Sequence, residues 1–301
     1  DELDRKPTLA ILADFSAPVK LDFSMDDTQL LQIMAQADNS FCRWDAGQRL
    51  LMSYIQKLTL VKGFVLPDAL NDAIKAILTS GDDRAFIAEQ LAIPSFDEAA
   101  GLIAEVEPSD LVHALQTLTS FIANSAQKEL YNCYQACRND DNDTANEVAN
   151  RSLKNICLHY LSTLNEYQYL VNEQYLLSSG HLDVSKENMT DTLAALNCGS
   201  EHNLVEFDQH MQDFEQKWQS TTLVMDKWFA LKASHAYGGI FKQLEGLLSH
   251  PLFTLKNPNR ARSLIGAFAM NNPEFFHCKS GKGYEFLTAQ IIKLNDINPQ
   301  V

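Results

Sequence analysis

Two arginines, Arg260 and Arg262, lie within three residues of each other at the start of an expected helix. The whole chain of 301 residues contains only eight arginines, so a close pair at this position requires an explanation. Partial positive charge gathers at the N-terminal end of a helix and disfavours a cation there. Either each guanidinium pairs with a nearby carboxylate, or one is held toward a cavity to meet a carboxylate or a peptide carbonyl. The residues alone leave both interpretations open.

A zinc site is the next chemistry to test, because His202, Glu206 and His210 recur every four residues along one face of an expected helix. The two histidines are eight residues apart, which is about 12 Å along a helix and too far for one ion. The segment also lacks the HExxH arrangement of zinc peptidases. We interpret it as a solvent-exposed polar face and predict no metal site in this chain.

The acidic stretch 138–150 raises the possibility of calcium binding, since oxygen-bearing side chains begin the pattern of a calcium loop at Asn139. Thr144 occupies the position that requires glycine, and Asn150 occupies the position of the bidentate glutamate. We therefore predict a loop between two helices, with Asp143 or Thr144 as the N-cap of the second helix.

Motifs for other kinds of catalysis are missing from the sequence. It contains no GxSxG, no GxxxxGK[ST], and no GxGxxG that follows a strand. The six cysteines are scattered and match the free, reduced thiols of a cytoplasmic protein. We expect no catalytic residues and no cofactor, and hence no enzymatic activity of this chain alone.

Composition narrows the class of protein further. Hydrophobic residues make up 46% and charged residues 21%, as in a folded globular chain. The formal net charge of −15 argues against a general nucleic-acid or anionic-membrane surface. No apolar stretch approaches the length of a transmembrane helix.

The elements that position these residues are predicted to be helices almost throughout. From Ser24 onward, amphipathic helical patterns alternate with short breakers, and Ser24 with Asp27 resembles a capping box. Successive short connections predict an all-α fold, a curved superhelical stack of antiparallel helix pairs of the HEAT/armadillo kind. A compact irregular helical bundle is the alternative. Residues 1–23 carry the strand-like "VKLDF" and are expected to be a linker or the last strand of an upstream domain; residues 24–301 form the helical domain.

The helix that carries the two arginines is the most clearly delimited one. Asn257 suits its N-cap and Pro258 its first position. Leu264, Ile265 and Phe268 fall on one face, and the helix is expected to end at 271–273.

Several segments, taken together, resemble one protein family. The C-terminal anchors are "NPNRARSLIGAFAMNNPEFFH" (257–277), "GYEFL", "KLND" and "NPQV", and the upstream ones are "LVMDKWF" (223–229), "NMTDTLAAL" (188–196), "RWDAGQRLL" (43–51) and "FSAPVKL" (15–21). In this order they resemble the C-terminal part of bacterial aminopeptidase N, the alanyl-type zinc metallopeptidases of proteobacteria.

The resemblance implies a geometry and a division of labour. In that family "FSAPVKL" closes a small β-sandwich domain, and the following curved helical domain covers the catalytic domain and encloses the active-site cavity. The zinc and the glutamate-bearing GAMEN motif belong to the catalytic domain, and this sequence has neither HExxH nor GAMEN. Family members continue beyond "NPQV", so we expect the helical domain to be truncated at its C-terminal end.

Functional residues carry over from the family sparingly. The second arginine of the NPNRxR motif and the glutamine of NPQ face the substrate cavity in that family, which implies substrate-binding roles for Arg262 and Gln300. Arg260 belongs to the same motif and joins the candidate substrate-binding residues, although a structural role is expected for it.

Together these points predict the non-catalytic cap domain of a cytoplasmic zinc-dependent aminopeptidase that removes N-terminal residues from peptides. The expected partners are the catalytic and β-sandwich domains of the same polypeptide and the peptide substrates, with no nucleic acid and no membrane. The alternative from another class is a free-standing α-solenoid protein-interaction module.

Overall fold

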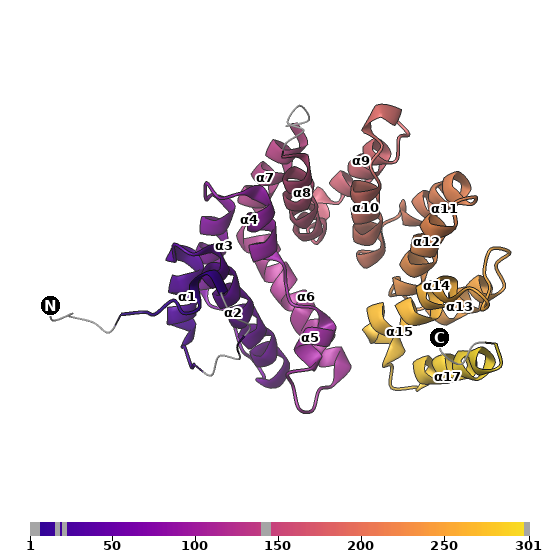
Figure 1. The fold of residues 1–301 in the computed structure, drawn as a ribbon, viewed down its shortest axis with the longest axis horizontal. Helices are drawn as coiled ribbons and strands as arrows, with labels where there is room; N and C mark the ends of the chain where they lie inside the picture. The colour runs from indigo at the N-terminus through magenta and orange to yellow at the C-terminus, as the bar shows by residue number, and fades with distance from the viewer. Residues whose placement is uncertain (1–6, 16–18, 20–22, 140–145, 298–301) are drawn as a thin grey trace. The chain divides into compact units, whose positions relative to one another are not determined.

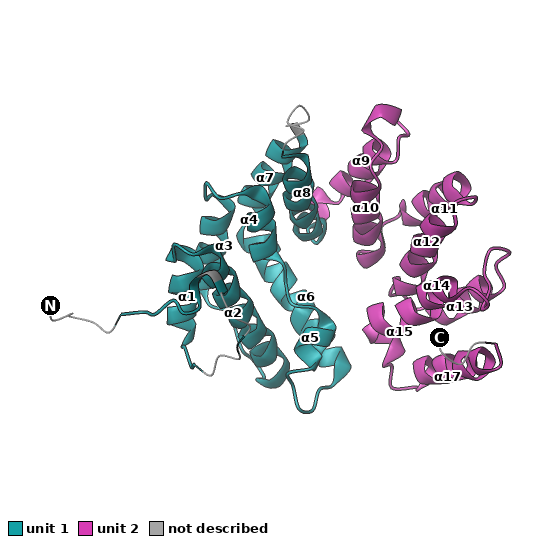
Figure 2. Cartoon of the chain, viewed as in Figure 1, with its two compact units in different colours: residues 1–164 teal, residues 165–301 magenta. Residues whose placement is uncertain are grey.

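The computed structural model describes residues 7–15, 19, 23–139 and 146–297. All regular structure in these residues is helical, and no β-strand occurs among them. The predicted all-α class is therefore confirmed. The chain divides into two compact units, Asp1–Leu164 and Asn165–Val301 (Figure 2). None of the described helices combines the length and apolar composition that a membrane crossing requires.

Unit 1 is built from helices that pack against one another in pairs (Figure 1). Helix α2 packs against α1 and α6, α4 packs against α8, and α7 packs against α8. The predicted apolar face of α6 is buried through Leu111, Leu118 and Ile122. The elements of this unit are η1 (Ala13–Phe15), α1 (Asp27–Gln36), α2 (Ser40–Leu60), α3 (Asp68–Leu78), α4 (Arg84–Leu91), α5 (Phe96–Ala100), α6 (Pro108–Ser125), α7 (Gln127–Asn139) and α8 (Glu147–Ser162).

Unit 2 is organised around α12, which packs against the helices before and after it. Its buried Trp228 donates a hydrogen bond of 2.9 Å from Nε1 to the carbonyl of Met211. The elements are η2 (Asn165–Tyr167), α9 (Tyr169–Ser178), η3 (Val184–Lys186), α10 (Met189–Glu201), α11 (Phe207–Trp218), α12 (Thr222–Ser234), α13 (Ile240–Leu248), α14 (Pro258–Ala261), η4 (Arg262–Gly266), α15 (Ala267–Asn271), α16 (Pro273–Phe276) and α17 (Lys282–Asn295).

Two predicted helix starts are wrong. Helix α1 begins at Asp27 with Asp26 as its N-cap, because Asp26 accepts from the Gln29 backbone and the Gln29 side chain accepts from the Asp26 backbone. The capping box therefore lies two residues beyond Ser24. Helix α8 begins after Asn146, whereas the predicted caps Asp143 and Thr144 lie outside the described residues.

The expected strand at the start of the chain falls mostly outside the described residues, since 20–22 are not among them. Just before it, Ala13–Phe15 form the short 3-10 helix η1.

Candidate functional site at Arg262

The helix carrying the two arginines starts where the sequence predicts. The Asn257 side chain accepts hydrogen bonds from the backbone N–H groups of Asn259 (3.0 Å) and Arg260 (3.4 Å), and Pro258 takes the first position. Leu264, Ile265 and Phe268 are buried, as their spacing predicts. The N-cap and the apolar face together fix how this segment is rotated about its axis. That rotation decides the direction in which each arginine points.

Arg260 points inward, and each of its guanidinium nitrogens has a partner. Nε donates to Asp226 on α12, one terminal nitrogen donates to the Leu252 carbonyl, and the other donates to the Thr222 carbonyl at 3.1 Å. The guanidinium also lies over the ring of Phe229, 4.7 Å from its centroid. Arg260 is only 4% exposed.

These contacts join two of the sequence anchors. Asp226 and Phe229 belong to "LVMDKWF", and Arg260 belongs to "NPNRAR". The buried charge is matched by a carboxylate, two carbonyl oxygens and an aromatic face, as a buried guanidinium requires. The contacts of Arg260 thus connect the start of α14 to the first half of α12.

Arg262 points the other way. Two residues correspond to a rotation of about 200° on a helix, so if Arg260 faces the interior Arg262 faces outward. Arg262 is exposed, and its side chain forms no ion pair or hydrogen bond with any of the described residues. A guanidinium with five free donors is well suited to bind a carboxylate or a carbonyl oxygen.

A π-helical segment, η4, begins at Arg262. The Ala267 N–H donates to the Arg262 carbonyl, five residues back, which makes this turn wider than that of an α-helix. Such segments are often found at functional sites because they turn side chains away from the regular α-helical positions. Sequence periodicity did not reveal η4, because the apolar residues on either side remain compatible with an ordinary helix.

The third predicted site residue, Gln300, lies outside the described residues. The structure therefore brings Arg260 and Arg262 together at one helix start.

The predicted polar face at 202–210 is wrong in two respects. Helix α10 ends at Glu201 and α11 starts at Phe207, so His202 and His210 do not share a helix. His210 is buried rather than solvated: its ring stacks on Tyr175 with centroids 3.9 Å apart, and Nε2 lies 3.0 Å from the Asn172 side-chain oxygen. Burial lowers the pKa of His210. His210 and Tyr175 therefore form a packed interior contact.

Metal ligation has no candidate in the part of the chain that the structure describes. No three His, Cys, Asp or Glu side chains there come together in a group that could hold an ion. All six cysteines are free thiols.

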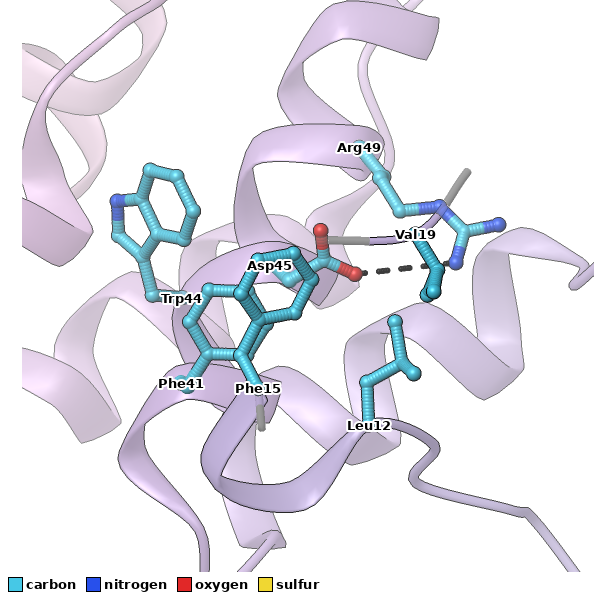
Figure 3. A pocket seen from close by; sticks show the side chains of 7 residues that line it. All are labelled: Leu12, Phe15, Val19, Phe41, Trp44, Asp45 and Arg49. Atoms are coloured by element: carbon cyan, nitrogen blue, oxygen red, sulfur yellow. Dashed lines mark ion pairs between the residues drawn. The ribbon is translucent and has the colours of Figure 1, made fainter. Parts of the chain in front are cut away.

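A cavity of about 510 Å³ in unit 1 was missed by the sequence reasoning (Figure 3). Phe15 and Phe41 stack with centroids 4.7 Å apart, and the Asp45 carboxylate faces Arg49 at 3.9 Å. Burial raises the pKa of Asp45, while Arg49 opposes the rise. Most of the lining residues belong to the anchors "FSAPVKL" and "RWDAGQRLL", and this membership was the only signal for the cavity in the sequence. The cavity is lined by Leu12, Phe15, Val19, Phe41, Trp44, Asp45 and Arg49.

One known family model matches almost all of the chain. A family model described as "Domain of unknown function (DUF3458_C) ARM repeats" matches residues 27–301. Its first residue is also the first residue of α1.

Two known proteins to which the chain is similar are aminopeptidases. The chain is 39% identical to aminopeptidase N of Escherichia coli (strain K12) over 310 residues, which cover 100% of this chain and 35% of that protein. Against aminopeptidase N of Haemophilus influenzae the identity is 38%, over 98% of this chain and 34% of that protein. The chain thus spans about a third of the length of these curated relatives.

A solved structure agrees with these matches. The crystal structure of Legionella pneumophila aminopeptidase A in complex with aspartic acid is similar with a TM-score of 0.85 and 25% identity. The similarity covers 96% of this chain and 35% of that one. The homology is to the C-terminal part of these larger enzymes.

Proposed function

The chain belongs to the family of DUF3458_C ARM-repeat domains, and on that premise we propose that it is the non-catalytic helical cap of a zinc-dependent aminopeptidase. In this role it encloses the active-site cavity, restricts access to peptides and adds contacts to the substrate. The observation that carries the proposal is homology over the whole chain to only about a third of aminopeptidase N. The catalytic and β-sandwich domains would be supplied by the same polypeptide, in the cytoplasm.

Arg262 is the substrate contact in this proposal. Its exposed guanidinium, without a partner among the described residues, is free to donate to a peptide carbonyl or carboxylate. Arg260 holds the helix start in place through Asp226 and thereby sets the direction of Arg262. Gln300 is proposed as a second contact on the strength of the family resemblance alone.

Zinc has no place on this chain in the proposal. The described residues include no group of side chains that could hold the ion, and the family resemblance implies that its ligands would belong to the catalytic domain. The chemistry that zinc would supply there is the activation of a water molecule for peptide hydrolysis. The contribution of this chain is confined to binding, orienting and enclosing the peptide.

The test is Arg262→Ala in the full-length enzyme. A hydrogen bond to a charged group contributes about 1.5–3 kcal/mol, so we expect kcat/KM for peptides to fall about 10- to 100-fold. The zinc content, measured by atomic absorption, should not change. Lys256→Ala removes another exposed cation just before the helix and serves as the matched control. Unchanged kinetics of Arg262→Ala on several peptides would refute the substrate contact.

The alternative is a free-standing solenoid that binds a protein partner, and the coding sequence around this chain distinguishes the two hypotheses. If the chain is an aminopeptidase cap, that coding sequence should contain an upstream HExxH motif followed by a distal glutamate. An open reading frame without them would exclude the aminopeptidase cap and leave the interaction module.

A further inference from the structure

The cavity in unit 1 has no role in the proposed function (Figure 3). One of its walls is a single face of α2, because Phe41, Asp45 and Arg49 follow one another at intervals of four residues. Leu12 and Phe15, which precede α1, contribute a second wall. The cavity volume of about 510 Å³ lies within the range of about 300–1,000 Å³ that is typical of small-molecule sites.

The second wall is held against α2 by direct contacts. The Cys42 thiol donates a hydrogen bond of 3.3 Å to the Ile11 carbonyl, and the ring of Phe15 stacks on that of Phe41 with centroids 4.7 Å apart. The ring of Trp44 lies next to Phe41 at 5.8 Å. The cavity therefore has defined aromatic and aliphatic surfaces, which suit the apolar part of a ligand.

Two opposite charges lie within this apolar setting, and neither is fully used. The Asp45 carboxylate points toward Arg49 (Figure 3), but the 3.9 Å between their nearest atoms is longer than a hydrogen bond. Arg49 donates from its other terminal nitrogen to the Phe23 carbonyl at 2.8 Å. The Asp45 carboxylate accepts no hydrogen bond from the residues that the structure describes. Both side chains can be reached by a ligand, since Asp45 is 39% and Arg49 is 31% exposed.

The chemistry of these two charges defines what each of them can bind. Burial raises the pKa of Asp45, although Arg49 opposes the rise, so the ionised carboxylate has lost part of its hydration and gains from a cationic N–H donor. The guanidinium of Arg49 has donors left for a carboxylate. A partly exposed pair of this kind contributes little to stability, and a ligand that engages both of its members therefore disrupts little.

We propose that this cavity binds a free α-amino acid with an aromatic or aliphatic side chain. Its ammonium group binds Asp45, its carboxylate binds Arg49, and its side chain packs against the rings of Phe15 and Phe41. An α-amino acid carries both charged groups on one carbon atom, which matches two protein charges that lie side by side. The binding site does not depend on the proposed function, although amino acids of this class are released when N-terminal residues are removed from peptides.

The test is calorimetric titration of the 301-residue chain with three related probes. L-Phenylalanine carries both charges, phenethylamine lacks the carboxylate, and 3-phenylpropionate lacks the amine. Saturable binding of L-phenylalanine with a Kd of about 1 mM or tighter is expected from its size. Each analogue should bind at least about tenfold more weakly, since it loses one hydrogen-bonded charge. No binding of L-phenylalanine, or equal binding of either analogue, would overturn the proposal.

Conservative variants locate the site. Asp45→Asn and Arg49→Gln each remove one charge and should weaken the binding of L-phenylalanine by about tenfold or more. The matched control is Arg151→Gln, because Arg151 forms the same kind of i,i+4 pair with Glu147 on α8 of unit 1. Its affinity should equal that of the wild type.

Unchanged affinity in Asp45→Asn and Arg49→Gln would place the amino acid elsewhere and refute this site. Such a result would leave the proposed role of Arg262 standing, because that role is measured by peptide kinetics of the full-length enzyme. The comparison of the three probes on the wild-type chain decides the question even if a variant fails to fold.

Discussion

At the scale of single residues, the two arginines at the start of α14 have opposite surroundings. Arg260 is enclosed by Asp226, two carbonyl oxygens and the ring of Phe229. Arg262 is exposed, with no ion pair to the described residues. Pairing with a carboxylate therefore accounts for one of the arginines, while the cavity-facing interpretation stays a prediction for the other.

The contacts of Arg260 give a prediction about stability. Asp226→Ala leaves a buried guanidinium without its counter-ion, since the two side chains are only 14% and 5% exposed. Removing one partner of a buried ion pair costs about 3–5 kcal/mol, and the two remaining carbonyl acceptors place the expected loss near the lower end. Urea unfolding followed by circular dichroism measures it.

The control for this experiment is Asp208→Ala, which breaks the ion pair with Lys232. The Asp208 side chain is 81% exposed, so its loss should cost less than about 1 kcal/mol. Equal effects of the two substitutions would mean that the Arg260–Asp226 pair does not hold α14 to α12.

At the scale of elements, α14, η4 and α15 form one helical run with a widened turn in its middle. Ala261 and Ile265 on this run form a small core with Leu294 of α17, with Phe286 and Leu287 packed against it. Helix α17 starts close to α16, where glycine is required: a Cβ on Gly283 would lie 2.1 Å from the Phe276 carbonyl oxygen. This explains the glycine of the "GYEFL" anchor.

Two glycine substitutions test this packing in opposite directions. Gly283→Ala should destabilise the protein by about 1–3 kcal/mol or more, because backbone atoms have to move apart. Gly266→Ala meets only the Arg262 Cβ at 3.7 Å and keeps a helical conformation. It should stabilise the protein by about 0.4–1 kcal/mol. Thermal unfolding measures both changes, and a tolerated alanine at 283 would contradict the close approach of α17 to α16.

At the scale of the whole molecule, the chain divides into two compact units. Unit 1 is centred on buried residues of α2 and α6, and unit 2 on those of α12. In repeat proteins each helix pair contacts mainly its sequence neighbours, so stability is the sum of local contributions rather than one global property. The units are therefore expected to respond separately to denaturant.

The tryptophans allow this to be measured. Trp44 lies in unit 1, whereas Trp218 and Trp228 lie in unit 2. In Trp44→Phe, fluorescence reports unit 2 alone and circular dichroism reports both units, so the two urea transitions should not coincide. Trp218→Phe retains a tryptophan in each unit and is the control. Superimposable transitions in Trp44→Phe would show that the two units unfold as one.

Local patterns in the sequence determined much of this protein. Helical periodicity predicted the all-α class, the N-cap at Asn257 and the buried Phe268 face, and the resemblance identified the aminopeptidase N relatives. These features depend on residues within a few turns of one another. For the same reason, errors of a few residues at helix starts, such as Ser24 in place of Asp26, are expected where several residues can serve as a cap.

Only the tertiary structure decided which side chains are enclosed. Asp226 is 34 residues from Arg260, and Asn172 is 38 residues from His210. Spacing along one helix cannot reveal such partners, because they meet only when separate helices pack. Burial then lowers the pKa of His210, and packing against α12 gives Arg260 a fixed partner.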